Sequence, residues 1–187
     1  MTRIRWLIAG FAVYLALLAW IVLWKLEPPY VGEGGLRHVK LVPFVRTAED
    51  GASAPAEVLA NLLLFVPFGL YLGLLRPLAP WWRLAGVFAA SSLLLEAAQY
   101  LLSIGSTDLT DVIVNTAGGL AGLGLSALAR RSFRERAGIV MARVCAVVTV
   151  SLLVASAAFI ASPMHYAPLR DVRVPLDSAP DGRGPHH

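Results

Sequence analysis

Polar side chains recur in one segment that joins two apolar stretches of the chain. This segment, EAAQYLLSIGSTDLTDVIVNTAGGLAG, covers residues 96–122 and contains no lysine or arginine. Its acidic and amide residues are Glu96, Gln99, Asp108, Asp111 and Asn115. Ionisable groups beside lipid are costly, and those that a membrane protein retains are usually functional. The segment therefore predicts a polar site held within a membrane.

Helical spacing predicts which of these side chains share a face. Residues three, four or seven positions apart lie on one side of a helix. Glu96 and Gln99 then form one stripe, and Asp111 and Asn115 form another on the following helix. Asn61, near the start of an earlier apolar stretch, is expected at the same level. Glu96 should lie roughly 10 Å below the membrane surface, at about 1.5 Å of rise per residue.

Structural roles compete with a functional one for these residues. Asp108 is a good helix N-cap, and Asp111 in the first turn would be favoured by the helix dipole. Gln99 and Asn115 can hydrogen-bond between membrane helices, which is the common role of buried amides. Glu96 is harder to explain in this way, because a carboxyl group at that depth needs a partner. We therefore expect Glu96 to belong to a pocket.

Catalysis by this segment would need either a base or a metal ion. Glu96 or Asp111 could act as a general base, and Asp108 with Asp111 could hold a divalent cation with help from substrate phosphates and waters. The chain has no Ser-His, Cys-His or phosphate-loop motif, and its lone Cys145 excludes a cluster of thiolates. We therefore expect binding rather than catalysis, with no metal site and no cofactor.

Composition identifies the elements that must position these residues. Hydrophobic residues make up 57% of the 187 residues and charged residues only 15%, against about 45–50% and about 25% in soluble domains. The excess falls into long blocks typical of transmembrane helices. These blocks are 6–24, 58–75, 84–102, 112–128 and 139–161. We expect one membrane domain over residues 1–162 and a disordered tail at 163–187, which is rich in proline, aspartate and arginine.

Basic residues orient the expected helices. Arg3 and Arg5, then Arg76 and Arg83, and then four arginines within 130–136 fall on one side of the membrane if helices alternate. Cytoplasmic segments are enriched in lysine and arginine, which predicts a cytoplasmic N-terminus and an external C-terminus. This placement accounts for the formal net charge of +4 without nucleic acid as a partner. The fold class is thus an all-α polytopic membrane bundle of about five transmembrane helices.

Four short motifs resemble those of the VanZ-like family of bacterial membrane proteins. They are KLVPF at 40–44, NLLLFVPFG at 61–69, EAAQ at 96–99 and DLTDVIVNTAGGLAG at 108–122. Their order and spacing carry the resemblance, which covers about residues 36–130. It implies a multi-pass protein of the inner membrane that is connected with the cell envelope. The founding member of the family is associated with resistance to the glycopeptide teicoplanin, and the resemblance implies no particular reaction.

The resemblance also implies a set of recurrent residues. By position, these are Asn61, Pro67, Gly69, Glu96, Gln99, Asp111, Asn115 and Gly118. Many relatives carry an arginine just ahead of the first aspartate, where this chain has Gly105-Ser106-Thr107. We expect Arg46 or Lys40, from the loop between the first two apolar blocks, to supply the missing positive charge.

Three classes of function fit these features. The favoured one is a binding or shielding protein whose pocket in the outer leaflet engages a membrane lipid, a lipid-linked envelope precursor or a lipidated glycopeptide. The alternatives are a membrane-embedded enzyme on a lipid-linked substrate, using Glu96 and Asp111, and an ion-coupled transporter. The residues expected to contact the ligand are Asn61, Glu96, Gln99, Asp108, Asp111, Asn115 and Arg46.

Overall fold

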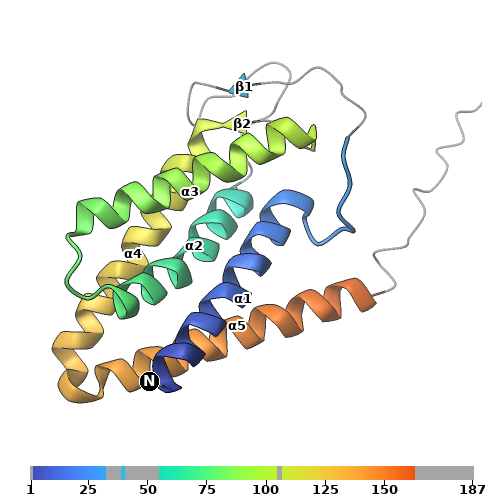
Figure 1. Ribbon diagram of the computed structural model, residues 1–187. Coiled ribbons are helices and arrows are strands. Elements are labelled where there is room, and N and C mark those ends of the chain that lie inside the picture. The colour runs from blue at the N-terminus through green and yellow to red at the C-terminus, as the bar shows by residue number, and fades with distance from the viewer. Residues whose placement is uncertain (1, 33–38, 41–54, 105–106, 163–187) are drawn as a thin grey trace, which may run out of the picture.

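The computed structural model describes residues 2–32, 39–40, 55–104 and 107–162. Within these residues the chain is almost entirely helical, as Figure 1 shows. The α-helices are α1 (Thr2–Trp24), α2 (Pro55–Leu75), α3 (Trp81–Leu102), α4 (Leu109–Phe133) and α5 (Ala137–Ala161). The short elements are the 3-10 helix η1 (Arg134–Arg136) and the strands β1 (Val39–Lys40) and β2 (Thr107–Asp108). The expected all-helical fold is thus confirmed for the described part of the chain.

The helices are long and apolar enough to cross a membrane. Four described stretches meet this condition, and the fourth, of 53 residues, joins α4, η1 and α5 without a break. Each α-helix begins two to four residues before the apolar block expected for it. The reason is that a helix can begin with residues that are not part of the apolar block, so hydrophobicity alone does not mark where the helix starts. The expected tail at 163–187 lies outside the described residues.

Local sequence explains where the helices near the polar segment end and begin. Pro55 starts α2, at a position where the missing N–H costs no hydrogen bond. Ser103 ends α3 in a left-handed conformation (φ 56°), and its N–H donates to the carbonyl groups of the last turn. Asp108 then caps α4, since its Oδ1 accepts a hydrogen bond from the N–H of Thr110 at 2.8 Å. The capping role weighed for Asp108 is therefore confirmed.

The helices α2 and α4 pack backbone to backbone along a line of glycines. A Cβ added to Gly118 would collide with the carbonyl oxygen of Leu62, and one added to Gly122 would collide with that of Val66. Gly69 of α2 lies equally close to the carbonyl group of Gly119. Small residues permit this approach between membrane helices, so the glycines of the Gly118–Gly122 motif serve to pack α4 against α2.

Aromatic side chains join α1 and α3 to this central pair. The rings of Tyr14 and Tyr71 stack with centroids 5.7 Å apart, and Tyr14 donates a hydrogen bond from its hydroxyl group to the carbonyl oxygen of Leu64. Phe88 of α3 meets Phe68 of α2 edge to face at 5.2 Å. The core is therefore built around α2. The glycine contacts described above place the N-terminal half of α2 beside the N-terminal half of α4.

The two ends of the bundle differ. At one end, called here the strand end, β1 pairs with β2 in parallel, with Lys40 opposite Asp108 (Figure 1). The opposite end, called the arginine end, includes the N-terminus of α1, the α2–α3 connection and the turn from α4 through η1 to α5. Its described arginines include Arg3, Arg5, Arg76, Arg83, Arg130, Arg131, Arg134 and Arg136. The acidic segment thus lies at the end away from these arginines.

Candidate functional site

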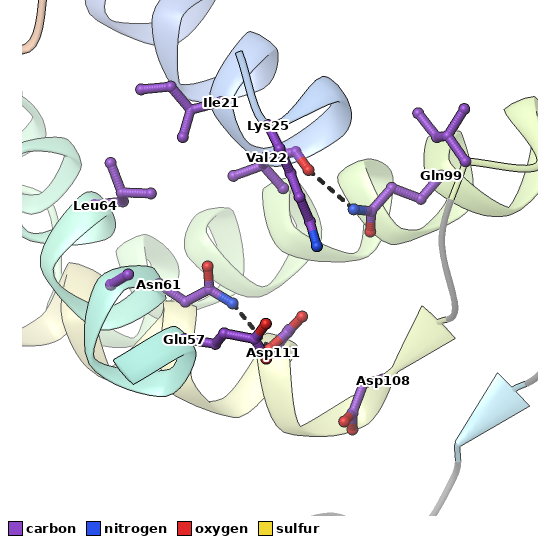
Figure 2. A pocket seen from close by; sticks show the side chains of 11 residues that line it. Ile21, Val22, Lys25, Glu57, Asn61, Leu64, Gln99, Asp108 and Asp111 are labelled. Atoms are coloured by element: carbon purple, nitrogen blue, oxygen red, sulfur yellow. Dashed lines mark hydrogen bonds between the residues drawn. The ribbon is translucent and has the colours of Figure 1, made fainter. Parts of the chain in front are cut away.

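Acidic and amide side chains from three helices meet at the strand end. Asn61 of α2 donates from its Nδ2 to Oδ1 of Asp111 in α4, at 2.9 Å (Figure 2). The two residues occupy the second turn of α2 and the first turn of α4. The glycine-mediated contact between these helices brings their first turns together. The pairing of α2 and α4 therefore positions Asn61 and Asp111.

Glu96 lies behind this pair, with only 3% of its surface exposed. Its Oε2 accepts a hydrogen bond from the backbone N–H of Asp108 at 3.0 Å, which ties the start of α4 to α3. The carboxyl group of Asp111 lies close enough to interact electrostatically with that of Glu96. Two carboxyl groups this close repel each other when both are charged, so the pair favours a proton or a cationic group beside it.

A second polar layer lies one helical turn further into the bundle. Asn115, one turn after Asp111, donates from its Nδ2 to Oγ of Ser92, one turn before Glu96, at 2.9 Å. This is the interhelical hydrogen bond weighed for Asn115 as a structural role. The Oδ1 atom of Asn115 is buried without a hydrogen-bond partner, and only 3% of the residue is exposed.

Gln99 connects the site to α1. Its Nε2 donates to the carbonyl oxygen of Val22 at 3.0 Å, close to the end of that helix (Figure 2). The residues Lys25 and Leu26 that follow α1 are both left-handed, with φ of 49° and 70°. The Lys25 side chain extends from there towards Asp111 and Gln99 (Figure 2). The end of α1 thus contributes a positive charge to an otherwise acidic site.

These residues enclose a cavity of about 310 Å³. Its polar lining residues are the acids Glu57, Asp108 and Asp111, the base Lys25 and the amides Asn61 and Gln99. The Asp108 side chain points away from the other polar side chains (Figure 2), and its Oδ1 caps α4. Apolar residues from α1 and α2 and Ile104 complete the wall. The arrangement can accept hydrogen bonds from a donor-bearing ligand while an apolar portion lies against the helices.

The structure separates the residues expected in the site into three groups. Those that line the cavity are Asn61, Gln99, Asp108 and Asp111. Glu96 and Asn115 lie behind it and support the lining. Arg46 lies outside the described residues, whereas the backbone of Lys40 lies beside Asp108 in the strand pair. No group of three or more His, Cys, Asp or Glu side chains among the described residues is arranged to hold a metal ion.

Sequence reasoning did not identify three of the residues around this cavity. Glu57 precedes Asn61 by one helical turn, and Ser92 precedes Glu96 in the same way, so the spacing rule would have found both. For Lys25, the sequence shows only a basic residue at the end of an apolar block, and this does not predict a place in the cavity. Its contribution depends on the left-handed turn after α1, which the sequence does not indicate.

Comparison with known proteins agrees with the motifs. The VanZ/LLP1 family model matches residues 11–130 of this chain. Protein VanZ of Enterococcus faecium is 34% identical over 128 residues, which cover 67% of this chain and 76% of that protein. No solved structure matches the chain. With a family match over most of its length, and apolar helices of membrane-spanning length, the chain belongs to the VanZ/LLP1 family of membrane proteins.

Proposed function

We propose that this protein is a multi-pass protein of the bacterial inner membrane with five crossings, formed by residues 1–162. In this topology α4 and α5 cross separately, and η1 makes the turn between them. The clustering of arginines at one end supports a cytoplasmic location for that end, because cytoplasmic segments are rich in basic residues. The strand end and the polar cavity then face the outer leaflet, with the C-terminus outside.

The cavity at the strand end binds the polar head of an envelope lipid or of a lipidated ligand. The observation that carries this proposal is the union of a polar lining with apolar helix surface in one cavity of about 310 Å³. A ligand with a hydrophobic tail can enter from the bilayer and place its head among the carboxylate and amide groups. Such a ligand remains in contact with lipid along the rest of its length.

Charge defines the chemistry of the head group. The lining includes three acidic residues, Glu57, Asp108 and Asp111, and one basic residue, Lys25, and Glu96 lies directly behind. This balance favours donors such as amines, amide N–H groups and hydroxyls. Envelope-precursor headgroups and lipidated glycopeptides present donors of these kinds. Similarity to Protein VanZ of Enterococcus faecium supports a link to glycopeptide (teicoplanin) resistance.

Mass spectrometry of lipids that co-purify with the protein tests this function. The variant Glu57→Gln/Asp111→Asn removes two negative charges, yet Asn at position 111 retains an oxygen acceptor for Asn61. We expect a specific lipid or lipid-linked precursor with wild type and its loss with the variant. Glu135→Gln, at the arginine end, is the matched control and should retain it. Identical lipid profiles for all three proteins would contradict a binding role of the cavity.

Susceptibility to teicoplanin measures the proposed link to resistance. A susceptible bacterial host expressing wild type or Glu135→Gln should tolerate more antibiotic than the host carrying the empty vector. The double variant should give the susceptibility of the empty vector. Equal tolerance with the double variant and wild type would show that resistance does not depend on the cavity.

A further inference from the structure

A second hollow lies away from the polar cavity, between α1 and α5. It is a groove of about 410 Å³ whose walls come from both helices, with Tyr71 of α2 at its base. Small residues from both helices line it, with Ala9 and Gly10 on α1 and Ala142 and Ala146 on α5. Both membrane helices therefore contribute small residues to the groove.

The groove presents hydrocarbon to its occupant. Its only buried polar side chains already bond to each other, with Tyr71 Oη and Thr149 Oγ1 2.9 Å apart and Thr149 donating to the carbonyl oxygen of Cys145 at 2.9 Å. A Cβ on Gly10 would lie 3.1 Å from Tyr71 Oη, so that hydroxyl group is also covered from the side of α1. An occupant is thus recognised by shape and dispersion contacts rather than by hydrogen bonds.

Basic residues at one end of the groove indicate which kind of headgroup the occupant carries. Arg5 lies one turn before Ala9 on α1, and Arg143 follows Ala142 on α5; both arginines are exposed. Neither α1 nor α5 contains an acidic residue, and the nearest described acid in the adjoining turn is Glu135. Trp6, 76% exposed, lies at the same end and suits the headgroup level of a bilayer. The end of the groove therefore has the charge that an anionic headgroup requires.

We propose that the groove between α1 and α5 holds one acyl chain of an anionic glycerophospholipid from the leaflet at the arginine end. The phosphate group of that lipid lies between Arg5 and Arg143, and the acyl chain runs along the alanine and glycine residues towards Tyr71. The lipid fills a hollow with a mostly apolar lining. It acts as a wedge between the first and last helices, at a site distinct from the polar cavity.

Native mass spectrometry after reconstitution tests this lipid site. The protein is placed in vesicles of equal parts phosphatidylglycerol and phosphatidylcholine, extracted in mild detergent, and analysed for retained lipid. Wild type should retain phosphatidylglycerol in preference. Ala146→Phe fills the groove from an exposed position and should remove bound lipid, whereas Ala127→Phe, exposed on α4, should not.

The charge of the headgroup is tested separately. Arg5→Gln/Arg143→Gln should reduce the preference for phosphatidylglycerol by about 30-fold, as expected for two basic residues at an anionic membrane surface. Arg76→Gln/Arg83→Gln should keep the preference, because Arg76 follows α2 and Arg83 lies in the first turn of α3, at the same end but outside the two helices that form the groove. Equal retention of both lipids by wild type, an unchanged preference in the first variant, or a dimer that Ala146→Phe separates would each overturn the proposal. The last result would assign the groove to a second copy of the chain.

Discussion

The strand end and the arginine end of the bundle hold their charges in opposite ways. At the strand end, Glu96 and Asp108 are buried, and backbone N–H groups donate to both carboxylates. At the arginine end the charged groups are mostly exposed, and Arg130 donates to the carbonyl oxygen of Gly73 at 2.8 Å. Exposed charge costs little and suffices to set topology, whereas buried charge costs much more and needs a use. The difference supports our proposal that the strand end carries the function.

The largest effect should come from the glycines that create the strand-end site. Gly122→Val forces a side chain into the carbonyl group of Val66, and overpacking of this kind costs about 3 kcal/mol or more. We expect little folded protein by size-exclusion chromatography. In contrast, Gly124→Val should fold normally, because a Cβ at that position meets nothing within 4 Å. Equal yields of both variants would show that α2 and α4 do not pack in this way.

The next effect concerns the buried carboxylate itself. Glu96→Leu removes the acceptor for the N–H of Asp108 and should lower the free energy of unfolding by about 1–3 kcal/mol. Glu96→Gln keeps an oxygen acceptor there and should retain most of the stability. Unfolding followed by circular dichroism in detergent measures both.

The same glutamine variant separates binding from catalysis. If Glu96 only supports the cavity, lipid binding and teicoplanin tolerance should survive in Glu96→Gln. Complete loss of tolerance in a variant that still folds and binds lipid would instead indicate a catalytic base, and would give the strand end an enzymatic role.

A moderate effect is expected from the cation of the cavity. Lys25→Gln removes the only basic residue among those that line the cavity. For an amine-bearing ligand, binding should strengthen by roughly fivefold, because a competing cation is removed; about 1 kcal/mol corresponds to this factor. Titration of dodecylamine into the purified protein measures it. Weaker binding would mean that the ligand head is anionic where it meets Lys25.

The smallest effect should occur at Asp108. Asp108→Asn preserves a capping oxygen for Thr110, so stability should change by less than about 0.5 kcal/mol. Asp108→Ala should cost about 1 kcal/mol, because the N–H of Thr110 loses this acceptor. Thermal unfolding distinguishes the two. A larger loss in Asp108→Asn would show that the charge of Asp108, and not its cap, stabilises the strand end.

Periodicity predicted much of this site, because helical spacing is a local property. It placed Glu96 on one stripe and Asp111 with Asn115 on another, and the hydrogen bond from Asn61 to Asp111 joins α2 to the same cluster. The contribution of Lys25 was not predictable, since it depends on how α1 ends. The parallel pairing of Lys40 with Asp108 was also missed, because two-residue strands leave no pattern in a sequence.

The groove between α1 and α5 was missed for another reason. Alanine and glycine in an apolar block look alike whether a neighbouring helix fills the space beside them or leaves it open. Gly122 is packed against α2, whereas Gly10 borders the groove. Only the relative placement of whole helices distinguishes these cases, and no local pattern encodes it.

The glycine contact between α2 and α4 has a mechanical consequence for ligand selection. Where two backbones touch, no side chain can change rotamer to widen the gap. The distance between Asn61 and Asp111 should therefore stay constant when a ligand binds. The Lys25 side chain, which reaches the cavity from the end of α1, can by contrast change rotamer. Ligands of different head size should therefore move the Lys25 side chain and leave the two inner helices where they are.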